Sequence, residues 1–461
     1  MLSFSVLAAE KPNIIFIYTD DHGYADMSCQ GMVKDVKTPY IDELAKGGAR
    51  MTNGYSTAPQ CCPSRAGLMT GRYQTRFDFE SNSECPLPLS ETTIATYLSK
   101  AGYETFHVGK WHLNANRQSK RFALIKTGVD VSKMTERELL LAGKNLTEKD
   151  VTKIVSKHNG DYEPKSRGFK VSINSDRDKK RYHLEVNNEE AVKFIDKNHD
   201  KPFFLYIAHR APHVPLTVTE KYLKRFPGKM PERRRKALAM ISCMDDGVGM
   251  LLKTLRKYKI EEKTIIFFMS DNGAPYKRFK KDEPGNGPGW DGSLNDPWTG
   301  EKGMLTEGGI RLPYLVYFKG TIKPQVYDQP VITLDATATA LDLAGVKAKK
   351  PLDGTNLIPY LSGQNSGKPN RDLFWRWRGQ AVIRSGKWKY MVLGNENNAM
   401  LFDVTSDKHE HNDLIKDHPE VAQELKKKLD SWMSVQNPPG LNSPKNFKFD
   451  NFNFYLKTSF K

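Results

Sequence analysis

Short apolar runs that end in clusters of polar residues recur along this chain and constrain its fold most strongly. Lys11–Tyr18 (KPNIIFIY) precedes TDDHG, Pro202–Ala208 (PFFLYIA) precedes HRAPH, and Thr264–Met269 (TIIFFM) precedes SDNG. A weaker run, Thr105–Val108, precedes GKWH. Runs of this length, rich in β-branched and aromatic residues, are typical of strands that are buried on both faces of a parallel sheet.

Amphipathic segments with helical spacing lie between these runs. The clearest are Pro39–Gly47, Thr92–Ala101, Asn187–Lys197 and Arg234–Lys257. Alternation of strands and helices predicts an α/β fold, in which helices sandwich a large, mostly parallel sheet. Ligands bind beyond the carboxyl ends of the strands in such sheets. We therefore expect the polar clusters to converge on one rim of the sheet.

The pattern changes near residue 370. LFWRWRG, QAVIRSGKWKYMVL and AMLFDV read as short antiparallel strands, and His418–Ser434 reads as a helix. These features predict a catalytic α/β domain over 12–369 and a smaller α+β subdomain with a tail over 370–461. Residues 114–182 are polar and poor in strand signals, so we interpret them as an insertion, and 438–461 as a strap on the surface. Residues 1–11 fit either a secretory-signal remnant or a frayed terminus.

The chain carries a formal net charge of +17 over 461 residues. An excess of this size attracts polyanions such as nucleic acid, anionic lipid or acidic polysaccharide, although a solvated basic surface is the simpler explanation. No helix-turn-helix, zinc-finger or RNA-recognition signature is present, so we expect no nucleic-acid partner. No apolar run approaches the roughly 20 residues that cross a bilayer, so we expect no membrane span.

Carboxylates at two strand ends suggest a cation site. Asp20 and Asp21 follow the first apolar run, and Asp271 and Asn272 follow the run at 264–269. Adjacent carboxylates repel each other unless a positive charge compensates them. An all-oxygen donor set suits Ca²⁺ or Mg²⁺. The alternative is ordinary turn chemistry, in which Asp and Asn are common.

Two adjacent cysteines stand before a short predicted helix in STAPQCCPSRAGLMTGR. Pro63 suits the first helical turn and Gly71 the helix end, which places a helix over residues 64–70 and Cys61 at its amino-terminal mouth. An anion attached to Cys61 would be stabilised there by free N–H groups. A vicinal disulfide, two small buried apolar side chains and a reactive thiolate are the alternatives.

CCPSRAGLMTGR resembles the C-x-P-S-R and T-G-R signature of the type I sulfatases, a formylglycine-dependent family of the alkaline phosphatase superfamily. Further segments are similar to motifs of that family in the same order: NIIFIYTDDHGYADMSCQG, GYETFHVGKWHL, KPFFLYIAHRAPHVPL, FFMSDNGAP, GEKGMLTEGGIRLP, LDGTNLIPYLSG and LFDVTSDKHEHNDL. The resemblance implies an alkaline-phosphatase-like fold and a maturation enzyme that oxidises Cys61 to formylglycine. Cys62 then falls on the variable position and is expected to have no role.

The resemblance also implies residue roles. Ca²⁺, with Mg²⁺ second, would be bound by Asp20, Asp21, Asp271, Asn272 and the modified Cys61. The hydrated aldehyde would attack sulfur and form a covalent sulfo-enzyme, which His112 would help to resolve by accepting a proton. Arg65 and Lys110 would stabilise the nucleophilic oxygen, Lys302 would hold a sulfate oxygen, and His213 would protonate the leaving alcohol. His22 would orient the acid pair.

The charge favours a sulfated poly- or oligosaccharide as substrate, with an algal galactan such as carrageenan ahead of a glycosaminoglycan. The residues expected to contact the glycan are His209, Arg210, Trp375, Arg376 and Arg378. One rival interpretation is a phosphonate or phosphodiester hydrolase of the same superfamily. Another is an inactive basic glycan-binding protein with an unmodified Cys61. A periplasmic or secreted location is expected.

Overall fold

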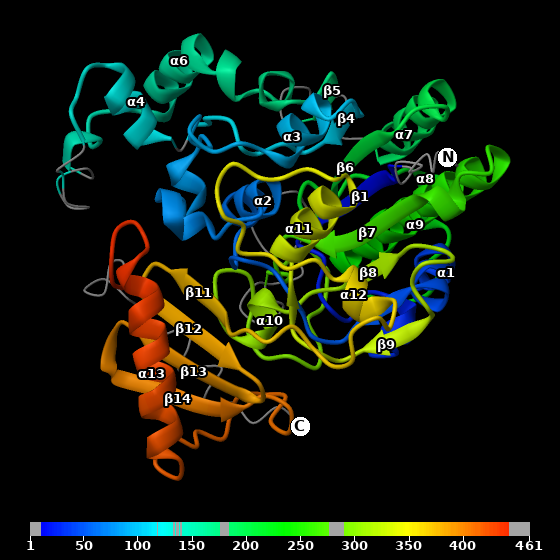
Figure 1. Cartoon of the computed structure of the whole chain (residues 1–461). Coiled ribbons are helices and arrows are strands. Elements are labelled where there is room, and N and C mark those ends of the chain that lie inside the picture. Colours follow the sequence, from blue (N-terminus) through cyan, green and yellow to red (C-terminus); the bar gives the residue numbers. More distant parts are fainter. Residues whose placement is uncertain are drawn as a thin grey trace, which may run out of the picture.

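The computed structural model describes residues 11–117, 119–131, 134, 138, 141–175, 184–275 and 290–441. The predicted amino-terminal segment lies outside these residues except for Lys11, and so does the predicted strap after residue 441. Figure 1 shows a large central sheet with helices around it and a separate smaller sheet. Within the described part of the chain, no helix combines the length and the apolarity that a membrane crossing requires.

The central sheet has eight strands in the order β5-β4-β6-β1-β7-β8-β2-β9. Their bounds are β1 Asn13–Asp20, β2 Ala49–Met51, β4 Glu104–Gly109, β5 Val171–Asn174, β6 Phe203–Pro212, β7 Thr264–Ser270, β8 Tyr314–Tyr317 and β9 Gln325–Tyr327. All neighbours pair in parallel except around β8, which is antiparallel to both β7 and β2. The predicted mostly parallel α/β sheet is confirmed, and its four predicted strands are β1, β4, β6 and β7.

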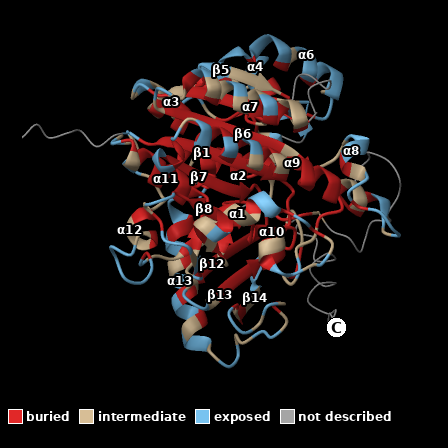
Figure 2. Ribbon diagram, turned by 90° about the vertical axis from the view of Figure 1, so that its right-hand side faces the viewer, coloured by how far each residue is buried: buried red, intermediate tan, exposed pale blue. Residues whose placement is uncertain are grey.

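Helices cover both faces of this sheet, because side chains alternate along each strand. On β1, the side chains of Phe16 and Tyr18 point into the core on one face of the sheet. The helices on that face are α2 (Cys61–Thr70), α3 (Ile94–Lys100), α11 (Leu334–Leu343) and α12 (Ile358–Leu361). Ile15 and Ile17 join the opposite core, with α1 (Pro39–Gly47), α7 (Leu184–Asn198) and α9 (Glu232–Lys257). Figure 2 shows the buried strands between these layers, with exposed residues on the outer helices.

A second, four-stranded antiparallel sheet follows in the carboxyl-terminal region, as the sequence predicts. It consists of β11 Leu373–Trp377, β12 Gln380–Ser385, β13 Trp388–Leu393 and β14 Asn395–Asp403. Helix α13 (Pro419–Ser434) packs across it (Figure 1), and Leu425 and Leu429 enter its core. Two short strands, β3 Gly54–Tyr55 and β10 Val331–Ile332, pair in parallel as a separate two-stranded sheet, and α10 spans Glu307–Ile310.

The predicted insertion at 114–182 needs a correction. Helices α4 (Lys120–Lys126) and α6 (Glu148–His158) form a small separate cluster at one end of the molecule. However, β5 (Val171–Asn174) pairs in parallel with β4 and forms the edge of the central sheet. Its side chains are exposed or half-buried, because an edge strand has a neighbour on one side only. Because β5 lacks a continuous buried apolar run, the sequence gives no clear strand signal there.

Helix α2 also starts earlier than predicted. It begins at Cys61 rather than Ser64, so Pro63 is the third helical residue. It ends at Thr70, and Gly71 caps it with the expected left-handed conformation (φ 68°). Cys62 forms a disulfide with Cys85. The expectation that Cys62 has no role is therefore wrong, and so is the vicinal-disulfide alternative, because Cys61 is a free thiol.

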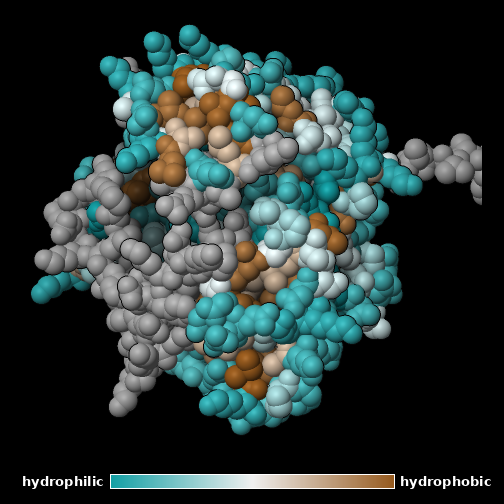
Figure 3. Space-filling model, turned by 90° about the vertical axis from the view of Figure 1, so that its left-hand side faces the viewer, coloured by the Kyte–Doolittle hydropathy of each residue, from teal (hydrophilic) through white to brown (hydrophobic). Residues whose placement is uncertain are grey.

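The outer surface is mostly polar. Figure 3 shows hydrophilic side chains over most of the described part of one face, with hydrophobic patches between them. The exposed large hydrophobic residues of the described chain come from widely separated segments, such as Met32, Leu141 and Val435. Scattered apolar side chains of this kind are normal on a globular surface. The fold therefore directs attention to the rim of the central sheet.

Candidate active site

The polar clusters at the strand ends meet at one rim, as the sequence predicts. Asp20 ends β1, and Asp21 adopts a left-handed conformation (φ 58°), so the chain turns directly after the strand. One ligand atom from each of Asp20, Asp21, Cys61 and His213 lies within 4.8 Å of the others. These residues come from β1, α2 and the end of β6, so the fold joins segments that are up to about 190 positions apart in the sequence.

Two lysines compensate the paired aspartates. Lys110 Nζ donates to Asp20 Oδ2 at 2.6 Å, and Lys302 Nζ donates to both carboxylate oxygens of Asp21 at 2.7 and 2.8 Å. Burial raises the pKa of Asp20, but the charges of Lys110, His213, Arg65 and Lys302 together outweigh burial and hold that pKa well below its usual range. Both aspartates are therefore carboxylates in the folded protein.

A glycine places Lys110 in this cluster. Gly109 adopts φ 109°, and a Cβ at this position would lie 2.0 Å from the carbonyl oxygen of Ala208 on β6. Only glycine fits so close to the neighbouring strand. The backbone N–H of Lys110 then donates to the same Ala208 oxygen at 2.8 Å, which fixes the turn that carries the side chain into the cluster.

Arg65 links helix α2 to the end of β7. Its Nε and Nη2 donate to Asp271 Oδ2 at 3.1 and 2.8 Å, and its Nη1 donates to the Lys110 carbonyl and to Tyr206 Oη, both at 3.2 Å. Arg65 is fully buried. Burial and the neighbouring Asp20 raise the pKa of Asp271 to about 7, although Arg65 opposes this shift.

Cys61 is the first residue of α2, so the amino-terminal end of the helix points its free N–H groups toward this region. The thiol is buried, and burial raises its pKa to about 11 even though Lys110 and Lys302 favour the thiolate. A thiol with this pKa is a poor nucleophile at neutral pH. The reactive-thiolate alternative is therefore not supported.

His213 faces the aspartate pair from the other side. Its Nε2 lies 3.7 Å from Asp21 Oδ2, its side chain is 22% exposed, and Nδ1 lies 2.5 Å from the Val214 carbonyl oxygen. Burial lowers its pKa to about 4. His112 adopts a left-handed conformation (φ 55°), and burial followed by the charge of Lys110 lowers its pKa well below its ordinary value. Both histidines are therefore neutral in the free protein at neutral pH.

The donor atoms of the cluster fit a divalent cation. Asp20 Oδ1 and Asn272 Oδ1 are buried without a hydrogen bond to any described residue. Asn272 Nδ2 donates to Asp21 Oδ1 at 2.6 Å, so its amide oxygen is left available beside the carboxylates. Buried oxygens of this kind need a partner, and hard cations such as Ca²⁺ bind carboxylate and amide oxygens.

The sequence interpretation missed two residues of this site. Tyr206, in the middle of β6, accepts the hydrogen bond from Arg65 but looks like an ordinary core residue in PFFLYIA. Asp291 Oδ2 accepts from the Val214 N–H at 3.3 Å, and its side chain bonds to that of Asp21. Burial and Asp21 raise the pKa of Asp291 well above its usual range. A lone acid in a glycine-rich loop gave no distinctive signal.

His22 does not orient the aspartate carboxylates. The ring Nε2 of His22 lies 2.8 Å from the Asp26 carbonyl oxygen, and its backbone N–H donates to Ser270 Oγ at 3.1 Å. Asp26 in turn accepts from Ser293 Oγ at 2.6 Å and from Arg234. His22 therefore belongs to the network that holds the loop around residues 290–295 against β1.

The predicted glycan contacts are only partly accessible. Trp375 is buried and its indole N–H donates to the Ser56 carbonyl at 2.6 Å, while Arg376 is buried and its Nε donates to Glu80 Oε1 at 2.8 Å. The prediction that these two residues contact substrate is wrong, because the packing of the second sheet occupies both. His209 is only 2% exposed, so direct contact with a glycan chain is not supported for it either. Arg210 is half-buried and Arg378 is exposed.

Comparisons with known proteins agree with this geometry. The sequence model of the Sulfatase family matches residues 12–346, and that of the N-sulphoglucosamine sulphohydrolase C-terminal region matches residues 298–435. The chain is 31% identical over 398 residues to an arylsulfatase of Hemicentrotus pulcherrimus, which covers 82% of this chain and 67% of that protein. It is 29% identical to an N-acetylgalactosamine-6-O-sulfatase of Bacteroides thetaiotaomicron, over 92% and 93% of the two chains.

A solved structure is similar over nearly the whole length of this chain. The structure described as Ps i-CgsB in complex with k-i-k-neocarrahexaose superposes with a TM-score of 0.71 and 28% sequence identity. The match covers 97% of this chain and 98% of that chain. The similarity therefore includes the second sheet as well as the central one.

Proposed function

Since this chain belongs to the sulfatase family and is a sulfuric ester hydrolase, we propose that it removes sulfate esters from a sulfated galactan of the carrageenan type. Sulfated carbohydrates are the substrate class that the related proteins support. One observation carries the proposal for the site: Asp20, Asp21, Cys61 and His213 present ligand atoms within 4.8 Å of one another at the rim of the sheet. An arrangement of acids, a modifiable cysteine and lysines suits the transfer of an anionic sulfuryl group.

Two groups complete the site in this proposal. A divalent cation, Ca²⁺ before Mg²⁺, would be held by Asp20, Asp21, Asp271, Asn272 and the modified Cys61. The formylglycine made from Cys61 supplies, when hydrated, the oxygen nucleophile, and the cation lowers the cost of its negative charge. Support comes from the orphaned oxygens of Asp20 and Asn272 and from the position of Cys61 at the start of α2.

The residues of the chain then have separate roles. Arg65, held by Asp271, and Lys110, held by Asp20, keep positive charge beside position 61. Lys302 would bind a sulfate oxygen, because its ammonium group reaches the cluster from the opposite loop and keeps 18% of its side-chain surface exposed. Charged donors that are already in place stabilise an anionic transition state without reorganisation.

Histidines would handle the protons. His213 is the candidate for protonating the leaving alcohol, because its side chain is partly exposed and adjoins the aspartate pair. A sugar alkoxide is a poor leaving group, and such proton donation contributes roughly 10²–10⁴-fold in rate. His112 would accept the proton when sulfate is released. Its place directly after Lys110 and Trp111 brings it to the same strand end.

Several observations support a galactan substrate. The related structure Ps i-CgsB is described in complex with a neocarrahexaose, and it covers nearly the whole chain at 28% identity. The net charge of +17 favours a polyanionic chain over a small aryl sulfate. Arg210 and Arg378 keep exposed surface for neighbouring sulfate groups. The Cys62–Cys85 disulfide supports an oxidising location, the periplasm or the exterior.

The test is a substrate panel with the protein co-expressed with a formylglycine-generating enzyme. Sulfate release is measured from defined neocarrageenan oligosaccharides, from N-acetylgalactosamine 6-sulfate and from 4-nitrophenyl sulfate, each against a 4-nitrophenyl phosphonate ester. We expect the highest kcat/KM on the carrageenan oligosaccharides. A preference for N-acetylgalactosamine 6-sulfate contradicts the galactan assignment, and faster phosphonate hydrolysis favours the phosphonate hydrolase. An unmodified Cys61 by mass spectrometry, with glycan binding and no turnover, favours the glycan-binding protein.

A further inference from the structure

A basic cavity of about 410 Å³ lies between the two sheets, outside the cluster described above. Its walls include Asn53, which follows β2, Asp328, which follows β9, and the hairpin that joins β12 to β13. Five basic side chains and one acidic side chain line it: Arg311, Lys368, Arg384, Lys387, Lys408 and Asp328. The cavity therefore carries a strong excess of positive charge.

Only part of this charge is compensated by ion pairs within the described part of the chain. Arg311 pairs with Glu307 at 3.1 Å, and Lys387 pairs with Asp403 at 3.0 Å. Lys368, Arg384 and Lys408 form no ion pair with any residue of the described ranges. The carboxylate of Asp328 accepts a hydrogen bond from the neighbouring Gln329 amide at 2.6 Å. Three of the five cations that line the cavity thus lack an ion-pair partner among the described residues, and Asp328 is the one acidic side chain in its lining.

Arg384 is the central observation. It is only 3% exposed, yet its hydrogen bonds go to neutral oxygens: Nη1 to Asn53 Oδ1 at 3.1 Å and Nε to the Gly386 carbonyl at 3.4 Å. Its guanidinium lies over the ring of Tyr55, 5.0 Å from the centroid. Burial lowers its pKa to about 10, although the negative charge of Glu410, which forms no ion pair with it, opposes this shift. A buried cation is costly unless an anion pairs with it.

A buried donor without a hydrogen bond to any described residue also lines this cavity. The indole N–H of Trp298 is buried and makes no hydrogen bond within the described part of the chain. The Arg311 guanidinium stacks on the Trp298 ring, 3.6 Å from its centroid, so the ring is held in place. Buried donors without a protein partner call for an acceptor. The cavity therefore combines positive charge with one unsatisfied donor among the described residues, and this combination suits an oxyanion.

We propose that this cavity is a secondary binding site for a sulfate group carried by the sulfated carbohydrate. Arg384 would make the charge-assisted contact, with Lys368 and Lys408 at the entrance, and this assignment rests on the proposed function. The cavity opens at the rim that carries the cluster, since β2 and β9 run parallel to β1 and Asn53 and Asp328 follow their carboxyl ends. Three strand spacings of about 4.8 Å separate β2 from β1, which gives a lateral offset of about 14 Å.

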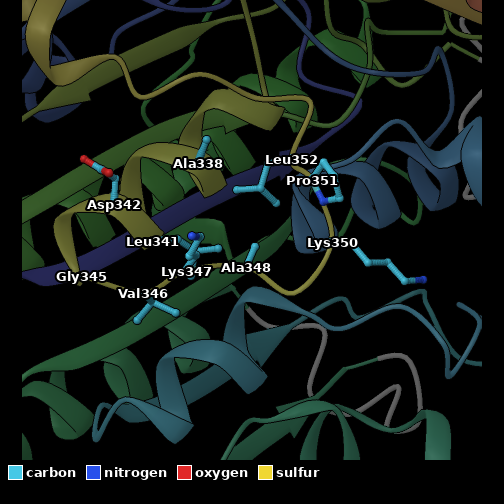
Figure 4. A pocket seen from close by; sticks show the side chains of 10 residues that line it. All are labelled: Ala338, Leu341, Asp342, Gly345, Val346, Lys347, Ala348, Lys350, Pro351 and Leu352. Carbon is cyan, nitrogen blue, oxygen red and sulfur yellow. The ribbon is translucent and has the colours of Figure 1, made fainter.

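Another cavity provides a matched control. It has a similar volume, about 400 Å³, and lies beside α11, where Lys347 and Lys350 are among its lining residues (Figure 4). Lys350 pairs with Glu91 at 2.6 Å, so its charge is already compensated. Lys347 is exposed at the surface. Removing charge from this second cavity tests for a general electrostatic effect.

The experiment measures binding without turnover. In a Cys61→Ala background, labelled dextran sulfate is titrated at fixed ionic strength against Arg384→Gln and against the double variant Lys368→Gln/Lys408→Gln. The control is Lys347→Gln/Lys253→Gln, which removes one exposed lysine from the second cavity and one from α9. We expect Kd to rise about tenfold in both cavity variants and by less than about twofold in the control. The double variant changes only exposed side chains, so it remains informative if Arg384→Gln unfolds.

Equal Kd values for the cavity pair and the control pair overturn the secondary site. Inorganic sulfate is titrated as a competitor of the labelled polymer. If inorganic sulfate binds as tightly as each sulfate group of the polymer, the ligand of the cavity is free sulfate, and the assignment to a carbohydrate sulfate is wrong. Hydrolysis of 4-nitrophenyl sulfate by the same cavity variants with Cys61 intact should be unchanged. Absent hydrolysis in the parent protein contradicts the proposed function, whereas intact hydrolysis with equal Kd values contradicts the secondary site alone.

Discussion

The ammonium nitrogen of Lys302 lies 2.7 and 2.8 Å from the two carboxylate oxygens of Asp21. This contact joins the loop before α10 to the end of β1, across 281 positions of sequence. Asp21 is buried, whereas the Lys302 side chain keeps 18% of its surface exposed. Lys302 can therefore hold the aspartate and still meet an anion that enters from solvent.

Replacing Lys302 by methionine keeps the length of the side chain and removes its charge. We expect kcat/KM for 4-nitrophenyl sulfate to fall by about 10²–10³-fold, because under the proposed function the variant loses a preorganised donor to the developing negative charge. Lys253→Met, at an exposed position of α9, is the control and should retain full activity. Activity of Lys302→Met within threefold of the parent would show that this ammonium group has no part in the reaction.

Cys61→Ala tests the nucleophile. We expect sulfate release to fall by at least about 10³-fold, because alanine cannot be converted to formylglycine. The free energy of unfolding should change by less than about 2 kcal/mol, since only a sulfur atom is removed at this buried position. Both quantities are measured on the same preparation, by sulfate release and by urea unfolding. Retained turnover would refute the assignment of Cys61.

Gln380 fixes the loop that carries Lys302. Its Oε1 accepts from the Leu305 N–H at 2.8 Å, and its Nε2 donates to the Gly303 carbonyl at 3.2 Å. This side chain of β12 therefore binds the loop on both sides of Met304. We predict that Gln380→Ala lowers kcat/KM about tenfold, because a small displacement of Lys302 would weaken the contact that we propose it makes with the transferring group. Gln380→Glu keeps the acceptor for Leu305 and should recover part of the loss.

A double-mutant cycle separates positioning from general destabilisation. If Gln380 acts through Lys302, Gln380→Ala should cost less than about twofold in a Lys302→Met background. A purely structural role predicts the same tenfold loss in both backgrounds, together with a matching loss of unfolding free energy. Steady-state kinetics and urea unfolding on the four proteins of the cycle give both readings.

The residues that the sequence predicted well are those that follow apolar runs. Each of them lies at or just after the end of a parallel strand: Asp20, Lys110, His213 and Asp271. The carboxyl ends of parallel strands lie at the same edge of a sheet, independently of the sequences of the loops. The periodicity of strands and helices therefore determined both the fold class and the meeting of these residues. Helix α1 has the predicted bounds, Pro39–Gly47, because its amphipathic spacing is visible in the sequence.

Contacts that depend on packing between distant segments were not predictable. In LFWRWRG, the alternation of side chains along a strand does not determine which of them face solvent. Trp375 and Arg376 are both buried because β11 packs against the segments that contain Ser56 and Glu80. Likewise nothing in the sequence pairs Cys62 with Cys85. Asp291 becomes part of the site only because the loop around residues 290–295 folds back on β1.

The Cys62–Cys85 disulfide should stabilise the start of α2. It closes a loop with a sequence separation of 23, and a ring of this size contributes about 3 kcal/mol in the chain-entropy description. We expect reductant to lower the free energy of unfolding by about this amount. Cys62→Ala/Cys85→Ala should show the lower stability with or without reductant.

Thiol counting verifies the pairing in the Cys61→Ala variant. The remaining free cysteines are Cys29 and Cys243, so iodoacetamide should label two residues in denaturant and four after reduction. Four labelled residues without reductant would contradict the disulfide.

Asp245 provides a pH-dependent contribution to stability away from the active site. This residue of α9 is 1% exposed, and its Oδ1 accepts from the N–H groups of Tyr40 and Ile41 in the first turn of α1, at 3.0 and 2.8 Å. Burial raises its pKa to about 7, from 3.8 in an exposed carboxyl, although the two backbone N–H groups oppose the shift. The folded protein therefore binds a proton here that the unfolded chain has lost.

The sign of the effect follows from proton linkage. Between pH 4 and 7 the folded state binds more protons at Asp245 than the unfolded state, so its contribution to the unfolding free energy falls as pH rises and is constant above about pH 7. Asp245→Asn keeps the single oxygen that accepts both N–H groups and removes the titration. We expect the variant to gain more than about 1 kcal/mol relative to the parent between pH 4 and 7.5. Urea unfolding of both proteins at several pH values measures this difference, and parallel pH profiles would show that Asp245 is ionised in the folded protein throughout.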